Sequence, residues 1–431
     1  MFRIQEKLSE MTERGEQIYI SIIGCGKMGK GLICQLRHIP GIVPSVIVDH
    51  TPEKAKSVLL SIGIPEDRIR ITDDPEEGAR FHKMNGYVVS AKEEMAYLPG
   101  VHAVVEATGV PNTGARIAVN AIHHHKHIIL LNVECDCAVG PILYRMAQKE
   151  GVVYTGTKGD EPGAILDLVD FALATGFDLV AVGKGKNNKL DREQTDETLA
   201  EEARSKGLSP HMLCSFVDGT NTMTELGTVC NAIGFVPDVP GCHGITAKPD
   251  TIAGILSRKD QGGILSREQV VDFAFGMAPG VFAIVTSEEP EVVSLMEYLG
   301  LGKGPNYTLY RPYHLTSLET PITIFSAVIE HESSLAPVKG QVIDVITVAK
   351  RDLKKGESLK GIGRDTAYGL LVSHKEQQEK DLLPFTICDE STILTQDVKK
   401  GEWLTYRDVK LDENREIVRL RRQQDQEERS C

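Results

Sequence analysis

The first third of the chain alternates short apolar runs with longer amphipathic stretches. The apolar run Ile18–Ile23 ends at a glycine, a helical pattern covers 27–38, and a second apolar run covers 43–48. Further strands are predicted at 87–90, 101–106, 127–132 and 152–155, with helical stretches among them. Because alternating strands and helices form parallel sheets with right-handed crossovers, residues 1–155 are predicted to be a doubly wound α/β domain of the Rossmann type.

The middle of the chain, residues 156–335, predicts an α+β domain of the kind that supplies substrate contacts. A helix is expected over 162–175 and a buried strand over 178–182. A strand, a helix and a strand are expected at 280–286, 290–299 and 307–312, before a last helix at 315–331. This region is expected to be the catalytic and dimerisation domain.

From residue 336 to residue 411 the pattern changes to short β-like pieces. Asp352-Leu-Lys-Lys-Gly-Glu-Ser-Leu is echoed by Asp397-Val-Lys-Lys-Gly-Glu-Trp-Leu, which predicts a small β domain with two similar turns. Residues 412–431 form a highly charged tail whose clear apolar residues are Ile417, Val418 and Leu420. A solvated terminal helix is expected there.

Charge and cysteine content exclude several classes of function. The 431 residues include 48 basic and 61 acidic side chains, a net charge of −13, and no long Lys/Arg block. Such a chain is a poor partner for nucleic acid or an anionic membrane surface. The nine scattered cysteines are typical of reduced thiols. No run approaches roughly 18–20 apolar residues, and no signal peptide is recognisable, so a cytoplasmic protein is expected.

A glycine-rich turn joins the first predicted strand to the first predicted helix. It reads Gly24-Cys25-Gly26-Lys27-Met28-Gly29. In dinucleotide-binding turns the first glycine allows the tight turn, the second lets the pyrophosphate approach the backbone, and the third lets the helix pack on the sheet. Asp49 ends the second strand 20 residues after Gly29, where a carboxylate accepts from the ribose hydroxyls of NAD. The alternative is a strand-to-helix turn that binds no nucleotide.

Asp49 also bears on the choice of cofactor. An anionic side chain there repels a 2′-phosphate, so NAD(H) is favoured over NADP(H), while the nearby His50, Lys54 and Lys56 offset that charge in part. The nicotinamide half of the cofactor is expected at the ends of the next two strands of the crevice. The residues there are Ala107, Thr108 and Gly109 after one strand, and Asn132 and Glu134 after the other.

Gly183-Lys184-Gly185-Lys186-Asn187-Asn188 follows a predicted buried strand. A lysine ammonium beside a carbonyl stabilises the alkoxide that develops during hydride transfer and can donate its proton. Lys184 and Lys186 are therefore candidate catalytic groups, with Asn187 and Asn188 as candidate substrate contacts. The alternative is a surface β-turn.

Two further polar stretches stand near predicted helix starts. Asp160 and Glu161 either favour the helix dipole or contact the substrate or a divalent ion. In the second stretch Thr316 and Ser317 are either helix caps or, with Arg311 and the possible proton carrier His314, a phosphate site. No metal is assigned from these residues.

Several of these motifs together carry a family resemblance. GCGKMG, EATG, NVECD, GDEPG, GKGKNN, KGP at 303–305 and RPYHLTSLE resemble the 1-deoxy-D-xylulose 5-phosphate reductoisomerase-like oxidoreductases, a homoserine dehydrogenase-like group, over nearly the whole chain. The Lys-Lys-Gly-Glu region after residue 336 resembles a SAF domain, a small β-clip module.

The resemblance implies a cytosolic, homodimeric, NAD(P)-dependent oxidoreductase with a small-molecule substrate. The leading reaction is reductive isomerisation of 1-deoxy-D-xylulose 5-phosphate to 2-C-methyl-D-erythritol 4-phosphate, an isoprenoid precursor. By resemblance the residues around the reacting carbons are Lys184, Lys186, Asn187, Asn188, Glu134, Asp160 and Glu161, and those at the phosphate end are Arg311, His314, Thr316 and Ser317. The family uses NADPH, and the chain departs from it at Val48-Asp49-His50-Thr51.

Three other interpretations stay open. The chain is alternatively a homoserine dehydrogenase-like enzyme, although GKGKNN and RPYHLTSLE favour the first family, or a dehydrogenase of sugar acids or polyols. The third interpretation is a non-catalytic NAD(H) sensor whose SAF-like domain binds a ligand or partner.

Overall fold

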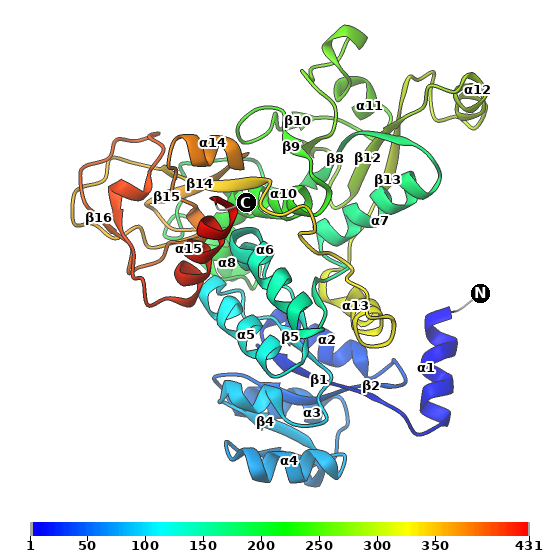
Figure 1. Ribbon diagram of the computed structural model, residues 1–431, viewed down its shortest axis with the longest axis vertical. Coiled ribbons are helices and arrows are strands. Elements are labelled where there is room, and N and C mark those ends of the chain that lie inside the picture. Colours follow the sequence, from blue (N-terminus) through cyan, green and yellow to red (C-terminus); the bar gives the residue numbers. More distant parts are fainter. Residues whose placement is uncertain (1–2, 430–431) are drawn as a thin grey trace. The chain divides into compact units, whose positions relative to one another are not determined.

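The computed structural model describes residues 3–429, which fall into two compact units (Figure 1). The N-terminal unit contains the residues up to 160 together with 315–336. The second unit contains 161–314 and the residues from 337 onward. None of the helices in residues 3–429 is long and apolar enough to cross a membrane.

The N-terminal unit is built on a parallel sheet that confirms the predicted Rossmann architecture. Within the described residues its strand order is β3-β4-β2-β1-β5-β6-β7, and each neighbouring pair is parallel. The strands are β1 (Ile18–Ile23), β2 (Ile42–Val48), β3 (Ile69–Ile71), β4 (Tyr87–Ser90), β5 (Ala103–Glu106), β6 (His127–Leu130) and β7 (Tyr154–Gly156). The helices are α1 (Arg3–Glu13), α2 (Lys27–Leu36), α3 (Pro52–Ser61), α4 (Pro75–Lys83), α5 (Pro111–His123), α6 (Val133–Glu150) and α13 (Thr320–Phe325).

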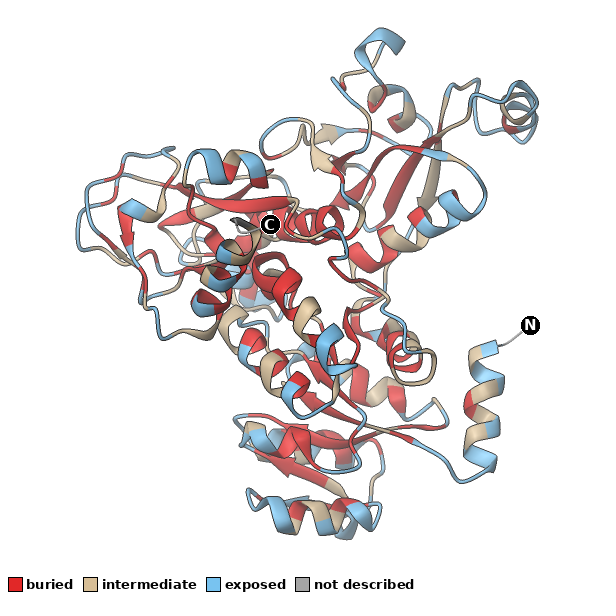
Figure 2. Cartoon of the chain, in the orientation of Figure 1, coloured by how far each residue is buried: buried red, intermediate tan, exposed pale blue. Residues whose placement is uncertain are grey.

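The central strands of this sheet are nearly continuous apolar runs because helices cover both faces. In β1, Ile20 and Ile22 are fully buried, and they share a core with Leu32 of α2. Figure 2 shows these strands in the colour of buried residues. Ile324 and Phe325 of α13 are fully buried in the same core, although about 300 residues separate them from β1 in sequence.

The structure divides the chain differently from the sequence prediction at three places. The N-terminal unit continues to residue 160, beyond the predicted boundary at 155. Residues 315–336, predicted to close the catalytic domain at 335, pack with the N-terminal unit because Ile324 and Phe325 complete its core. The region predicted as a separate domain over 336–411 belongs almost wholly to the second unit.

The second unit contains a mixed sheet with strand order β10-β11-β8-β12-β13 among the described residues, and β9 pairs with β11. Its strands are β8 (Asp178–Lys186), β9 (Val236–Pro237), β10 (Ile245–Thr246), β11 (Val270–Phe275), β12 (Val281–Thr286) and β13 (Asn306–Arg311). The helices are α7 (Glu161–Ala174), α8 (Ala200–Ser205), α9 (Pro210–Val217), α10 (Thr220–Ile233), α11 (Ile252–Ile255) and α12 (Pro290–Tyr298). β8 is central, parallel to β11 and antiparallel to β12.

Residues 337–429, here called the C-terminal module, belong to the second unit. They contain β14 (Ile343–Ala349), β15 (Ala367–Ser373), α14 (His374–Glu379), β16 (Ile393–Leu394), β17 (Val409–Lys410) and α15 (Glu416–Arg429). Several hydrogen bonds tie the module to α10; among them, Thr220 Oγ1 accepts from Gly369 N at 2.9 Å, and Asn231 Oδ1 accepts from Val342 N at 2.9 Å.

The two similar sequence phrases of the module form two reciprocal turns. Lys354 Nζ donates to Asp397 at 2.8 Å, and Lys399 Nζ donates to Asp352 at 3.0 Å. Backbone bonds between Leu353 and Val398 run in both directions, at 2.8 and 3.0 Å. The predicted pseudo-repeat is therefore confirmed as a pair of turns, each of which holds the aspartate of the other.

The prediction of a solvated C-terminal helix is wrong. In α15 the apolar residues Ile417 and Val418 are fully buried, and so is Arg421. Arg421 is compensated by Asp344 of β14 and by Asp425, whose Oδ1 lies 2.7 Å from Nε. The helix therefore docks through buried ion pairs, which its charged sequence conceals.

His374 of α14 supplies a pH-dependent part of this docking. Its Nδ1 lies 2.5 Å from Asp344 and its Nε2 lies 3.1 Å from Glu428. Burial by itself lowers the pKa of His374 and Arg421 opposes its charge, but hydrogen bonding to the two carboxylates and the charge of Asp344 outweigh both and raise that pKa to about 9.

We predict that the free energy of unfolding falls as the pH rises from 6.5 to 9, because the folded-state pKa is raised above the unfolded value near 6.5. The contribution is on the order of 2 kcal/mol, present below pH 6.5 and lost above pH 9. Urea unfolding at several pH values measures it. In His374→Gln this part of the pH dependence should disappear, and an unchanged slope would contradict the assignment.

Candidate functional site

The glycine turn of the N-terminal unit has the geometry of a dinucleotide-binding turn. Gly24 has φ +101°, and a Cβ on it would lie 2.6 Å from the carbonyl oxygen of Ala107. A Cβ on Gly29 would lie 1.9 Å from the carbonyl oxygen of Gly24. These two glycines are therefore required by the fold itself.

Gly26 differs from its two neighbouring glycines because a Cβ built on it meets nothing within 4 Å. It is the N-cap of α2 and supplies no side-chain cap, so the amides of Lys27, Met28 and Gly29 in the first turn keep their donors for a ligand. Open space beside uncapped amides suits a pyrophosphate. The residues present thus fit a nicotinamide dinucleotide.

Asp49 ends β2 beside this turn. Its Oδ2 accepts from Cys25 N at 2.7 Å and its Oδ1 from Thr51 N at 2.9 Å, and the residue is buried. The carboxylate is thereby fixed against the glycine turn, as a ribose-binding acid requires. Of the basic neighbours that offset it in the sequence prediction, Lys56 instead pairs with Glu66 at 2.8 Å.

The ends of β5 and β6 bear the residues predicted to line the nicotinamide half. Thr108 N donates to Glu106 Oε1 at 2.7 Å, and Gly109 has φ +66° with open space around it. Asn132 caps α6 by accepting from Cys135 N at 3.1 Å, and Glu134 is half-buried in the first turn of that helix.

Glu106, to which the sequence prediction gave no role of its own, is fully buried at the end of β5. Burial raises its pKa to about 7, and hydrogen bonds from Thr108 and Asn132 limit the rise.

In the second unit, Lys184 and Lys186 lie inside β8 and not in a loop after it. The prediction ended this strand at Val182, but it continues to Lys186, and both lysines are 5% exposed. The alternative of a surface β-turn is therefore wrong. The intervening glycines explain the pattern: a Cβ on Gly183 would lie 1.9 Å from the carbonyl oxygen of Asp272, and one on Gly185 would lie 2.2 Å from Ala278 N.

Two carboxylates hold the ammonium of Lys184. Its Nζ lies 2.7 Å from Glu161 Oε1 at the start of α7 and also donates to Glu225 of α10. Burial by itself lowers the pKa of Lys184, but the two carboxylates outweigh it and raise that pKa. Lys184 is thus a permanent cation in the site. His314 Nε2 lies 3.3 Å from the same oxygen of Glu161.

Lys186 is in a different electrostatic state. Its Nζ donates to the carbonyl oxygen of Phe216 in α9. Burial and the nearby charge of Lys184 lower its pKa to about 8, against the opposing effects of Glu225 and Asp218. Lys186 can therefore exchange a proton near neutral pH, which Lys184 cannot.

The remaining predicted residues are divided between the two units. Asn187 and Asn188 follow β8 directly, and Asp160 directly precedes α7. Arg311 at the end of β13 is paired with Asp167 at 3.3 Å and lies over the ring of Tyr313. Thr316 and Ser317 belong to the N-terminal unit, where Thr316 N donates to Gly159 O at 2.6 Å, and neither side chain caps a helix.

Glu161 and His314 are of residue types that bind divalent metals, and Asp160 precedes Glu161 in the chain. An ammonium 2.7 Å from the Glu161 oxygen opposes a cation at that oxygen. The geometry therefore favours an ion pair for Glu161.

The sequence prediction missed three charged residues that interact with the lysines of β8 or with their partners: Glu225, Asp218 and Lys350. For Glu225 the sequence does offer a signal, because it is the one acidic residue in a helix of mostly small and apolar residues, and it is 4% exposed.

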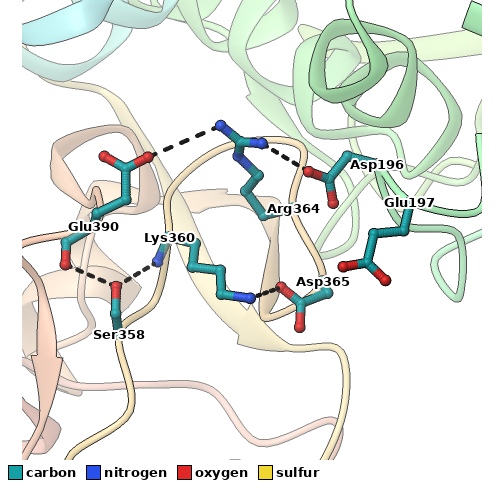
Figure 3. Close-up of a pocket in the computed structure, with 7 residues that line it drawn as sticks. All are labelled: Asp196, Glu197, Ser358, Lys360, Arg364, Asp365 and Glu390. Carbon is teal, nitrogen blue, oxygen red and sulfur yellow. Dashed lines mark hydrogen bonds and ion pairs between the residues drawn. The ribbon is translucent and has the colours of Figure 1, made fainter. Parts of the chain in front are cut away.

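A cavity of about 410 Å³ elsewhere in the second unit contains none of these groups (Figure 3). Its charged side chains pair largely with one another: Arg364 with Asp196 at 2.7 Å, and Lys360 with Asp365 at 2.9 Å. We therefore take the lysines of β8 and their partners as the candidate functional site.

Comparison with known proteins gives a match to one family domain. Residues 159–320 match the family described as "Oxidoreductase DRL, catalytic domain". L-Aspartate dehydrogenases of Cupriavidus taiwanensis and Cupriavidus necator are each 24% identical over 149 residues, which cover 33% of this chain and 55% of the relative. The match thus spans little more than half the length of these curated relatives.

Among solved structures, a probable dehydrogenase from Thermotoga maritima is similar at 13% identity and a TM-score of 0.42, over 75% of this chain and 92% of its own. A putative myo-inositol dehydrogenase from Sinorhizobium meliloti 1021 is similar at 10% identity and a TM-score of 0.40, over 75% and 93%.

The matched family domain contains Glu161, Lys184, Lys186, Glu225 and His314. The prediction of an enzyme is confirmed to this extent: residues 159–320 match an oxidoreductase catalytic domain, and the N-terminal unit has a Rossmann-type parallel sheet.

We predict that Gly26→Ala folds normally but binds NAD(H) at least about tenfold more weakly, because its methyl group enters the space expected for the pyrophosphate. Fluorescence titration with NADH and thermal unfolding measure the two properties. Gly254→Ala is the matched control, since a Cβ there also meets nothing within 4 Å. Equal NADH affinity in both variants would contradict the assignment of the turn.

Proposed function

We propose that the chain is an NAD(P)-dependent dehydrogenase or reductase acting at a hydroxyl or carbonyl carbon of a small polyhydroxylated substrate. The observation that carries the proposal is the pair of buried lysines in β8, one held as a cation and the other with a pKa of about 8. A nicotinamide dinucleotide held at the turn of Gly24, Gly26 and Gly29 would supply the hydride for reduction of a carbonyl carbon, and would accept it in the reverse reaction.

Lys184 stabilises the oxygen that becomes negative. A lysine ammonium has three donors, and Glu161 and Glu225 accept from two of them, which leaves one for a substrate oxygen. Because its charge is held by two carboxylates, it stabilises an alkoxide without losing its own proton.

Lys186 moves the proton. In reduction its ammonium donates to the substrate oxygen and becomes a neutral amine; in oxidation the amine takes the hydroxyl proton. A group whose pKa lies near the working pH serves best in both directions. Asn187 and Asn188 are proposed to bind substrate hydroxyls, and His314 to orient Glu161.

The resemblance makes 1-deoxy-D-xylulose 5-phosphate the leading substrate to test. Arg311 is already paired with Asp167, so its charge is partly neutralised and it contributes less to a phosphate site than the sequence suggests. The match to L-aspartate dehydrogenases favours an amino acid as the second candidate class. We also propose that the C-terminal module is a SAF-like domain and that the enzyme is a cytoplasmic homodimer, with no nucleic acid or membrane partner.

The function is tested by following NADH and NADPH absorbance with a panel of sugar phosphates, polyols, sugar acids, homoserine and L-aspartate. We predict that turnover in the reductive direction falls above pH 8, as Lys186 loses its proton. Lys186→Met should lose at least about 100-fold in kcat while NADH affinity is unchanged. NADH binding without turnover on the whole panel would favour the sensor interpretation.

Cofactor choice gives a separate prediction. We expect NADH to bind more tightly than NADPH, because the buried carboxylate of Asp49 repels a 2′-phosphate. Asp49→Asn should narrow the difference mainly by improving NADPH binding. Titration of both cofactors into both proteins measures the effect, and tighter NADPH binding by the unaltered protein would refute it.

A further inference from the structure

We infer that the C-terminal module is a working part of the catalytic site, in which Lys350 is a positioning residue that acts on Lys186 through Asp218. The inference rests on the proposed function, in which Lys186 carries the proton. It assigns a role to residues beyond the matched catalytic domain, which ends at residue 320.

Lys350 follows β14 directly, and its side chain is buried against the catalytic part of the second unit. Its Nζ lies 2.8 Å from Asp218 Oδ2, and the two side chains are 2% and 0% exposed. The same ammonium donates to the carbonyl oxygens of Gln194, at 2.9 Å, and Arg364, at 2.8 Å, and to Cys214 Sγ at 3.3 Å. These partners surround the ammonium and fix its position.

Asp218 connects this ion pair to the segment that holds Lys186. It directly follows α9 as its C-cap, and its Oδ1 accepts from Thr220 N at 2.9 Å at the start of α10. Two residues before it, the carbonyl oxygen of Phe216 accepts from Lys186. A displacement of Asp218 therefore moves the acceptor that orients the catalytic amine.

Asp218 also acts on Lys186 by charge. The charges that act on the pKa of Lys186 are those of Lys184, which lowers it, and of Glu225 and Asp218, which raise it. Lys350 neutralises much of the charge of Asp218 at a contact of 2.8 Å. Through Lys350, the module thereby limits how much the charge of Asp218 raises the pKa of Lys186.

A purely structural explanation accounts less well for this arrangement. Buried ion pairs are often no more stabilising than apolar residues of similar volume, so stability alone does not require charges here. The ion pair of Lys350 and Asp218 lies instead where the charge of Asp218 acts on Lys186, the group that gains and loses a proton in the proposed reaction.

The test compares the pH dependence of reductive turnover in Lys350→Met, Asp218→Asn and the double variant. Lys350→Met should shift the alkaline limb of kcat to higher pH, because Asp218 is no longer neutralised. Asp218→Asn and the double variant should shift it to lower pH, because the charge of Asp218, which raises the pKa of Lys186, is removed. Shifts of at least about half a pH unit are expected.

Lys375→Met is the matched control. Lys375 lies in the same module, its side chain is 84% exposed, and its removal should leave the limb unchanged. If Lys350→Met does not fold, the double variant, which leaves no charge unpaired, decides the question. A wild-type alkaline limb in Asp218→Asn and in the double variant, with only thermal stability lowered, would refute the inference.

A second readout separates failure of this inference from failure of the proposed function. The rate of reductive methylation of Lys186 against pH, followed by mass spectrometry, reports its pKa without any turnover. Shifts of that pKa in the predicted directions support the coupling even if no substrate is found. An unchanged pKa in Asp218→Asn refutes it even if the enzyme is active.

Discussion

Two lysine side chains lie at the C-terminal end of a buried strand, and the surrounding parts of the second unit compensate their charges. An ammonium removed from water without partners costs several kcal/mol, so each must meet carboxylates or carbonyls. Lys184 meets carboxylates from α7 and α10, and Lys186 meets a carbonyl from α9. The helices around β8 thus supply its charge balance as well as its apolar cover.

The unequal distribution of these partners shifts the pKa values of the two lysines in opposite directions. Lys184 receives two carboxylates, so little negative charge is left for Lys186, and the cation of Lys184 further disfavours a second cation beside it. Two side chains of one type, two residues apart, thereby differ in their readiness to release a proton. Neighbouring titratable groups that the surroundings push apart are typical of acid–base sites.

The sequence predicts the N-terminal unit well because its signals are local. Ile18–Ile23, the glycine turn and Asp49 follow one another at the spacing that a parallel sheet and a dinucleotide require, and each lies where it was expected. The nature of β8 was harder to predict, since a strand of alternating glycine and lysine resembles a polar loop. Only the backbones packed against Gly183 and Gly185 show why it is a strand.

Partners far apart in sequence could not be predicted. Glu225 reads as a single acid in a buried helix, and Lys350 as one more lysine in a charged region; their roles depend on contacts across 41 and 132 residues with Lys184 and Asp218. The same holds for Phe325, which completes a core begun at Ile18. Periodicity reports which face of an element is buried but not which charged groups meet there.

The buried ion pair between Lys350 and Asp218 links the C-terminal module to the part of the second unit that carries the two lysines of β8. Reciprocal turns and a docked terminal helix link the parts of the module to one another, while Thr220, Asn231 and Asp218 join it to the end of α9 and to α10. α10 also carries Glu225, so one helix contacts both the module and Lys184. A change in the contacts between the module and this helix would therefore alter the surroundings of both lysines, because close-packed protein interiors transmit small displacements. A module that only bound a separate ligand would have no need of a fully buried cation at this junction.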